Sequence, residues 1–119
     1  MGAISRRSFL QIGAAGVASV TFARAESDGD DGFTFAVVND THIVDAPSVA
    51  ILDGAVARIN SDRGIQFTCV LGDVATDGKK EELLLAKAAL DKLERPYYVV
   101  PGNHDVFMPD ADIYANYAD

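Results

Sequence analysis

Three apolar runs that alternate with two amphipathic stretches constrain the fold of this chain more than any other feature. The runs cover residues 33–38, 67–71 and 97–100, and each is short and rich in β-branched or aromatic residues, which is typical of strands buried on both faces. The stretches between them, residues 47–60 and 80–94, place apolar residues at helical spacing. The sequence therefore predicts a β-α-β-α-β arrangement in the α/β class.

A possible metal ligand follows each apolar run at the same distance. Asp40, Asp73 and Asn103 each stand two residues beyond the end of a run. Repeated βα units form a mostly parallel sheet with right-handed crossovers, and ligands bind outside the carboxyl ends of its strands. Because neighbouring strands lie about 4.8 Å apart, we expect the three oxygen-bearing side chains to meet at one edge of the sheet.

The first two turns each combine an acidic residue with a second notable residue. Asp40 and His42 are separated by one residue, so in extended backbone both point to the same side and can hold one ion. Gly72 before Asp73 allows a sharp turn, and a carboxylate there can bridge two ions. Taken alone, either pattern is more often a plain polar turn than a metal site.

The third turn, Gly102-Asn103-His104-Asp105, is the most specific of the three. Asn103 offers an amide oxygen to a metal. His104 can protonate a leaving alkoxide or donate a positive hydrogen bond, and Asp105 is expected to hold its ring. The alternative is an Asn-containing turn that starts a capped helix.

Together, Asp40-Thr41-His42, Gly72-Asp73 and the third turn resemble, in order and spacing, the first three motifs of the calcineurin-like metallophosphoesterase family. The resemblance extends over residues 33–105. It implies that residues 33–119 form the N-terminal half of that family's domain, a four-layered α/β/β/α sandwich.

The resemblance also implies an activity and a set of site residues. It implies two metal ions, iron, manganese or zinc, and water activated by them to hydrolyse a phosphomonoester or phosphodiester. Asp73 would bridge the two ions. The implied metal ligands are Asp40, His42, Asp73 and Asn103, and the implied catalytic pair is His104 and Asp105.

Two departures from the family pattern refine this expectation. The family commonly has an acidic residue three positions after the bridging aspartate, but here Thr76 stands there and the acid follows at Asp77. Similar turns occur in members that resemble class III cyclic-nucleotide phosphodiesterases. The family also adds a further His and a Gly-His-x-His motif downstream, whereas this chain has only two histidines. We therefore expect a truncated domain whose isolated 119-residue product binds metal weakly and is essentially inactive.

Residues 1–25 differ in composition from the rest and resemble a twin-arginine export signal. Arg6 and Arg7 precede a moderately apolar run of about 14 residues, and Ala23-Arg24-Ala25 matches a signal-peptidase site. An amphipathic surface helix and an uncleaved anchor are the alternatives, although the run is shorter than the roughly 20 residues of a membrane span. We expect cleavage, an exported periplasmic or extracellular protein, and a flexible linker at residues 26–32.

The charge distribution limits the possible partners. All 18 acidic residues lie after Ala25, with only seven of the ten basic ones, so the exported part has a formal net charge near −11. Such a surface repels polyanions, which disfavours general nucleic-acid binding. The single cysteine, Cys69, excludes an intrachain disulfide and is expected to be buried.

Three functions follow, and the first is favoured. It is a metal-dependent phosphoesterase that acts on a small phosphate ester. The second is an exported metal-binding or interaction module without turnover, which the acidic surface and partial ligand set suggest. The third is another enzyme of the same fold, such as a nucleotidase or an acid phosphatase. The DNA downstream of codon 119 would separate the first from the second.

Overall fold

The protein forms one mixed sheet with two helices packed against it. This description rests on a computed structural model and covers residues 8–13, 19–25 and 32–106. Within these ranges the sheet has five strands in the order β1-β2-β3-β4-β5. The elements are β1 (Ser8–Gly13), β2 (Ser19–Ala25), β3 (Phe33–Asn39), α1 (Val49–Ser61), β4 (Ile65–Val70), α2 (Lys80–Leu90) and β5 (Tyr97–Val99).

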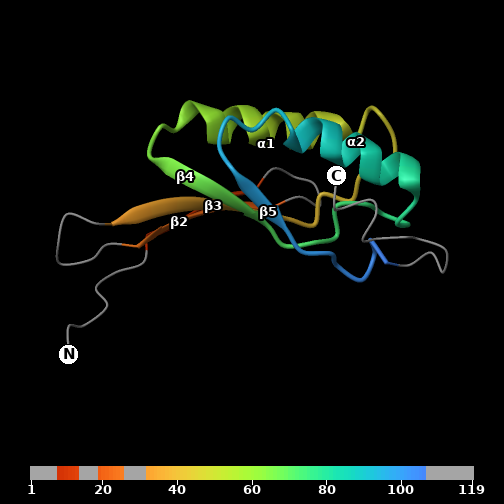
Figure 1. Ribbon diagram of the computed structural model, residues 1–119, viewed down its shortest axis with the longest axis horizontal. Coiled ribbons are helices and arrows are strands. Elements are labelled where there is room, and N and C mark those ends of the chain that lie inside the picture. Colours follow the sequence, from red (N-terminus) through yellow and green to blue (C-terminus); the bar gives the residue numbers. More distant parts are fainter. Residues whose placement is uncertain (1–7, 14–18, 26–31, 107–119) are drawn as a thin grey trace.

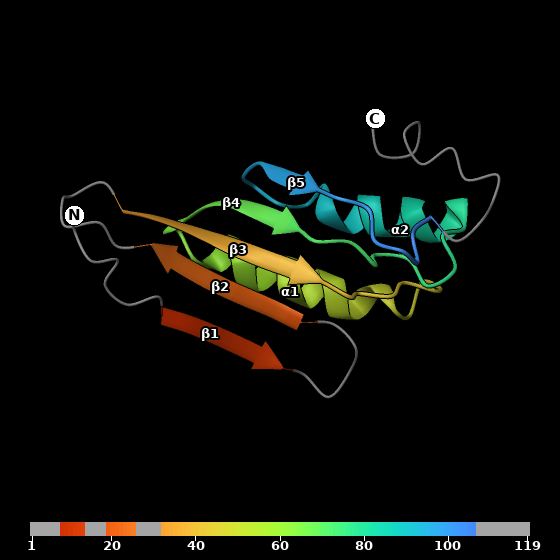
Figure 2. The ribbon, with the colours of Figure 1, turned by 90° about the horizontal axis from the view of Figure 1, so that it is seen from below.

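The strands β3, β4 and β5 are parallel and adjacent, as the sequence predicts. β3 pairs with β4 and β4 with β5, and each connection contains one helix. Figure 2 shows the carboxyl ends of all three strands at the same edge of the sheet. The β-α-β-α-β prediction is therefore confirmed, and it matches one half of the expected four-layered sandwich.

Both helices cover the same face of the sheet, and the core lies between them and the strands (Figure 1). The strands contribute inward-facing residues such as Val38 and Val70, both fully buried. The hydrophobic core is made of Ala36, Val38, Ile43, Leu52, Val56, Ile59, Ile65, Val70, Val74, Ala75, Leu83, Ala86, Ala89 and Leu90. The expectation that the strands are buried on both faces is wrong, because both helices lie on one side.

The opposite face of the sheet is lined by aromatic side chains. Successive side chains of a strand alternate between faces, so Phe35 and Phe67 point away from the helices. Their rings stack with centroids 5.1 Å apart. Phe33, which is 43% exposed, and Tyr98, which is 64% exposed, continue the row. Cys69 also belongs to this face and is only partly buried, contrary to expectation.

The described part of residues 1–25 adds two strands that the sequence did not predict. β1 pairs with β2, and β2 pairs with β3, both antiparallel. An unpaired β3 edge would expose backbone N–H and C=O groups, which a neighbouring segment can satisfy. Export and cleavage after Ala25 stay predictions, and cleavage would leave β3 as an edge strand. Among the described residues, no helix is long and apolar enough to cross a membrane.

Local contacts explain where the helices begin and end. The hydroxyl oxygen of Ser48, the residue before α1, accepts the backbone N–H of Asp45 at 3.1 Å, so a tight turn starts this helix two residues later than predicted. α2 ends four residues before the predicted end. The side chain of Asn60 bonds the carbonyl of Lys92 at 2.8 Å and the N–H of Glu94 at 3.0 Å, which diverts the backbone from the helix.

A hydrogen bond between Tyr97 and Asp91 should make the folded protein less stable at strongly alkaline pH. The Tyr97 hydroxyl donates to Asp91 Oδ1 at 2.6 Å. Partial burial, helped by this carboxylate, raises the pKa of Tyr97 from 10.0 to about 12. A raised folded-state pKa means that the contribution is fully present below about pH 10 and is lost as the pH rises through about 12.

We expect Tyr97→Phe to lower the free energy of unfolding by about 1 kcal/mol or less at pH 7, because the bond is partly exposed. The variant should also lose less stability than the parent between pH 10 and 12. Urea unfolding at several pH values measures both effects. Tyr98→Phe, on the exposed aromatic row, is the matched control and should change neither. Identical alkaline slopes for Tyr97→Phe and the parent would contradict the assignment.

Candidate metal centre

The candidate site is built from the three loops that follow β3, β4 and β5. The first loop pairs with the second through its backbone: His42 N–H donates to the Asp73 carbonyl at 3.0 Å, and Ile43 N–H to the Val74 carbonyl at 2.8 Å. The third loop joins through the N–H of His104, which donates to Asp73 Oδ1 at 3.0 Å. The three loops therefore meet at the carboxyl ends of the parallel strands, whereas the expected meeting of the Asp40, Asp73 and Asn103 side chains stays a prediction.

Glycines allow the second and third loops to approach this closely. Gly72 has φ 88°, and a Cβ built on it would lie 2.6 Å from the Cα of Gly102. A Cβ on Gly102 would in turn lie 2.8 Å from the carboxyl carbon of Asp73. Real Cβ atoms do not occupy such positions. Both glycines are therefore required for the observed placement of the Asp73 carboxylate.

Three candidate site residues have backbone conformations that residues other than glycine rarely adopt. Asp40 has φ 54°, His42 has φ 45° and Asp73 has φ 51°, and these are the only positive-φ residues other than glycine in the described ranges. Asp and His tolerate this left-handed region better than most residues. Backbone strain of about 1–3 kcal/mol per residue tends to concentrate at functional sites, where it places side chains. The strain therefore points to the same loops as the motifs.

His42, Asp73 and His104 form a group that could hold a metal ion. One ligand atom from each lies within 4.8 Å of the other two, and all three residues are partly buried. The two imidazole rings meet edge to face, with centroids 4.7 Å apart and an interplanar angle of 84°. Two imidazoles and a carboxylate suit divalent transition metals such as zinc or iron. The donor set thus fits a metal ion.

Asp40, another expected ligand, lies in the first loop but outside this group. Asp40 is half-buried, and its Oδ2 accepts a hydrogen bond from the neighbouring Asn39 amide at 2.5 Å. Asn103 is exposed in the third loop. The group thus contains two predicted ligands, His42 and Asp73, and His104, which was predicted to be catalytic. The assignment of the metal ligands stays a prediction.

Comparison with known protein families agrees with this geometry. The family model described as calcineurin-like phosphoesterase matches residues 33–119. The chain belongs to the calcineurin-like phosphoesterase family. No curated protein matches the chain significantly. Members of the family are metal-dependent phosphoester hydrolases that usually bind divalent metals, and the group at the sheet edge is compatible with that chemistry.

Asp105 does not orient the His104 ring, contrary to the expectation from the sequence. Its side chain is fully buried. Oδ1 accepts the N–H of Ala75 and Oδ2 accepts the N–H of Gly102, both at 2.8 Å. Asp105 therefore ties the second loop to the third. The His104 ring is oriented instead by the Thr76 carbonyl, which lies 2.7 Å from Nδ1.

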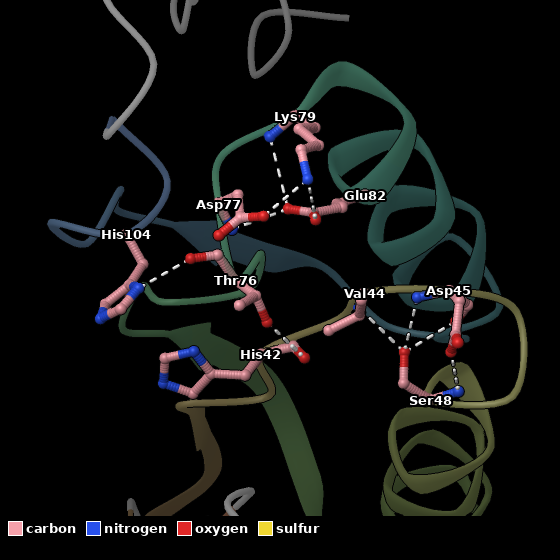
Figure 3. Close-up of polar contacts among 9 residues, drawn as sticks. All are labelled: His42, Val44, Asp45, Ser48, Thr76, Asp77, Lys79, Glu82 and His104. Atoms are coloured by element: carbon pink, nitrogen blue, oxygen red, sulfur yellow. Dashed lines mark hydrogen bonds and ion pairs between the residues drawn. The ribbon is translucent and has the colours of Figure 1, made fainter.

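Thr76 is a positioning residue that the sequence analysis noted only as a departure from the family pattern. Its hydroxyl donates to the backbone carbonyl of His42 at 2.9 Å, and its own carbonyl contacts His104 (Figure 3). It therefore connects the two histidines of the group. No motif could have revealed this, because one of its two contacts uses the backbone.

Glu82 is a second residue whose role appears only in three dimensions. It is 2% exposed, and its Oε2 accepts the N–H groups of Asp77 at 2.8 Å and Lys79 at 3.3 Å (Figure 3). These bonds fix the end of the second loop against the start of α2. Lys79 pairs with Asp77 at 2.6 Å, and this partner raises the pKa of its ammonium group. The capping contacts thus hold the loop that contains Asp73.

Proposed function

We propose that the product of the whole gene hydrolyses phosphomonoesters or phosphodiesters with water activated by metal. The observation that supports this most is the convergence of His42, Asp73 and His104 at the carboxyl edge of a parallel sheet. Family membership makes phosphoester hydrolysis the expected chemistry. The proposal concerns the whole gene product because the family's downstream histidine ligands are not among these 119 residues.

In this proposal, each residue of the three loops has a separate role in metal binding or proton transfer. Bound metal would acidify a water molecule and neutralise charge on the phosphoryl oxygens. Asp73 supplies a fixed negative charge between the loops, and the resemblance makes it the bridge of a two-ion centre of iron, manganese or zinc. Asp40 and Asn103 would complete the first and second ion positions. The resemblance gives His104 the transfer of a proton to the leaving oxygen.

The substrate proposed first is a phosphodiester of the cyclic-nucleotide type. This rests on the turn in which Thr76 replaces the common acidic residue, a feature shared with class III phosphodiesterases. The Thr76 hydroxyl donates to the His42 carbonyl, and the Thr76 carbonyl contacts the His104 ring. An acidic side chain at this position would lose the hydroxyl bond to His42. Comparing hydrolysis of a cyclic nucleotide with that of a simple aryl phosphate tests the preference. Faster hydrolysis of the aryl phosphate would contradict it.

Hydrolysis itself is tested on the full-length gene product with manganese. Chromogenic phosphomonoester and phosphodiester substrates should both be assayed, with and without a chelator. We expect activity that the chelator removes and manganese restores. Absence of any metal-dependent activity would contradict the hydrolase proposal. If metal still bound, that result would instead support a metal-binding module without turnover.

The proposed location is outside the cytoplasm, reached by the twin-arginine pathway. The pair Arg6 and Arg7 and the apolar run after it motivate this proposal. Fusing residues 1–32 to a reporter that is active only after export tests it. Replacing both arginines with lysine should abolish export, and unchanged export would contradict the proposal.

A further inference from the structure

One edge of β3 is suited to a partner strand from outside the phosphoesterase part of the chain. The other edge of β3 is taken by β4. Natural edge strands commonly carry a charged residue or a proline that discourages further pairing. The sequence of β3, Phe33–Asn39, contains neither. An uncovered β3 edge would therefore expose backbone groups with nothing in the strand to prevent their pairing.

The strand β2 covers this edge of β3 over its whole length. Residues 19–25 pair one to one with residues 33–39, and on the other side residues 19–24 pair with residues 8–13. Figure 2 shows β2 between β1 and β3. Successive backbone groups of a strand point to alternate sides, so pairing on both sides engages the N–H and C=O groups of every residue. β2 is thus an interior strand of the sheet.

The predicted signal-peptidase site lies at the end of this interior strand. Ala23 is opposite Phe9 of β1 and Phe35 of β3, and Arg24 is likewise paired on both sides. Ala25 is paired with β3. Binding of an extended segment by another protein uses the same backbone hydrogen bonds that pair strands in a sheet. A protease therefore has no free strand edge to bind at this site while both pairings persist.

We propose that β1 and β3 shield the predicted cleavage site in the folded chain, so that β2 must separate from β3 before residues 1–25 can be removed. Local opening near a chain end needs less free energy than unfolding of the core, so the shield can open while the rest of the fold persists. The relevance to export rests on the proposed twin-arginine route. The shielding itself does not depend on that route.

Trypsin cleavage after Arg24 measures the shielding in the full chain. A free peptide with the sequence of residues 19–30 gives the rate for an unpaired segment. We expect cleavage in the folded chain to be at least about tenfold slower than in the peptide, because proteolysis follows the small population of the open form. Equal rates in the chain and the peptide would overturn the proposal.

A proline in β2 tests whether backbone pairing causes the protection. Val20 is paired with both β1 and β3, so Val20→Pro removes an N–H from the ladder four positions before Arg24. Its cleavage rate should approach that of the peptide, whereas cleavage after Lys87 in α2 should stay slow. Val20→Thr is the matched control, because it keeps the N–H and the β-branched shape, and should be as slow as the parent. Slow cleavage of Val20→Pro after Arg24 would contradict the proposal.

Amide hydrogen exchange measures the same pairing in the parent chain, without any substitution. In β2, the N–H groups of residues 20–24 should all be protected, because this strand is paired on both sides. In β1, the outer strand of the described sheet, only alternate N–H groups should be protected. Protection of only alternate residues in β2, or of none, would show that the site is not shielded.

These measurements use the purified full chain, so they separate the shielding from the proposed export. Shielding in a chain whose first 32 residues do not export a reporter supports this inference and contradicts the proposed location. Export of the reporter without shielding in the full chain has the opposite meaning.

Discussion

Replacing Asp73 with asparagine should remove metal-dependent hydrolysis from the full gene product. Asp73 is the carboxylate in the group with His42 and His104, and it contacts the other two site loops through its backbone carbonyl and its side chain. Removing its charge should lower metal affinity and kcat/KM at least about 100-fold, because a lost ligand costs more than an outer-shell partner. Metal-binding titration and steady-state kinetics measure the two effects.

Asparagine isolates the charge from the backbone. It has nearly the same size, tolerates φ 51° and can still accept the N–H of His104 through its amide oxygen. The stability of the metal-free protein should therefore change by less than about 1 kcal/mol. Glu81→Gln removes one negative charge from an exposed helix position and should leave both activity and affinity unchanged. Retention of substantial activity in Asp73→Asn would exclude the proposed centre.

Replacing Gly72 with alanine should cause the largest loss of stability among the changes considered. The left-handed backbone at φ 88° costs a non-glycine residue about 1–2 kcal/mol. Overlap of the new methyl group with Gly102 adds about 1–3 kcal/mol. We expect the free energy of unfolding to fall by roughly 2–5 kcal/mol, which is a large part of the stability of a small domain. Urea denaturation of the metal-free protein measures the loss.

Gly54→Ala is the matched control, because it makes the same chemical change at a permissive position. Gly54 lies within α1, and a Cβ there would meet no atom within 4 Å. Alanine is a better helix former, so this variant should be more stable by about 0.5–1 kcal/mol. Two variants that change stability in the same direction would show that the loops are packed less tightly than the structure indicates.

The strand predictions succeeded because each strand contains enough local information. The run from Phe33 onward is continuous, apolar and β-branched, and the polar turn after it ends the strand close to the predicted position. The predicted positions of the helix ends were less accurate. The last turn predicted for α2 is replaced by contacts of Asn60, a residue 32 positions before Lys92, and no local pattern reports such a contact.

The prediction that both faces of the sheet are buried was wrong for a similar reason. A continuous apolar run shows that both faces of a strand are hydrophobic, but not that both are covered. Phe33 and Tyr98 remain exposed because the two crossover helices lie on the same face. The pairing of β2 with β3 was missed because the composition of residues 1–25 favoured an export signal, so no strand was predicted there.

The positions of Asp40, Asp73 and Asn103 beyond their strands were determined by the sequence alone, because apolar periodicity places strand ends and parallel topology brings those ends together. Tertiary structure decided which side chains converge. His104 joins His42 and Asp73, whereas Asp105 turns inward to two backbone N–H groups. The physical reason is that a loop side chain takes its direction from contacts with other loops, such as the Thr76 carbonyl, and these exist only after folding.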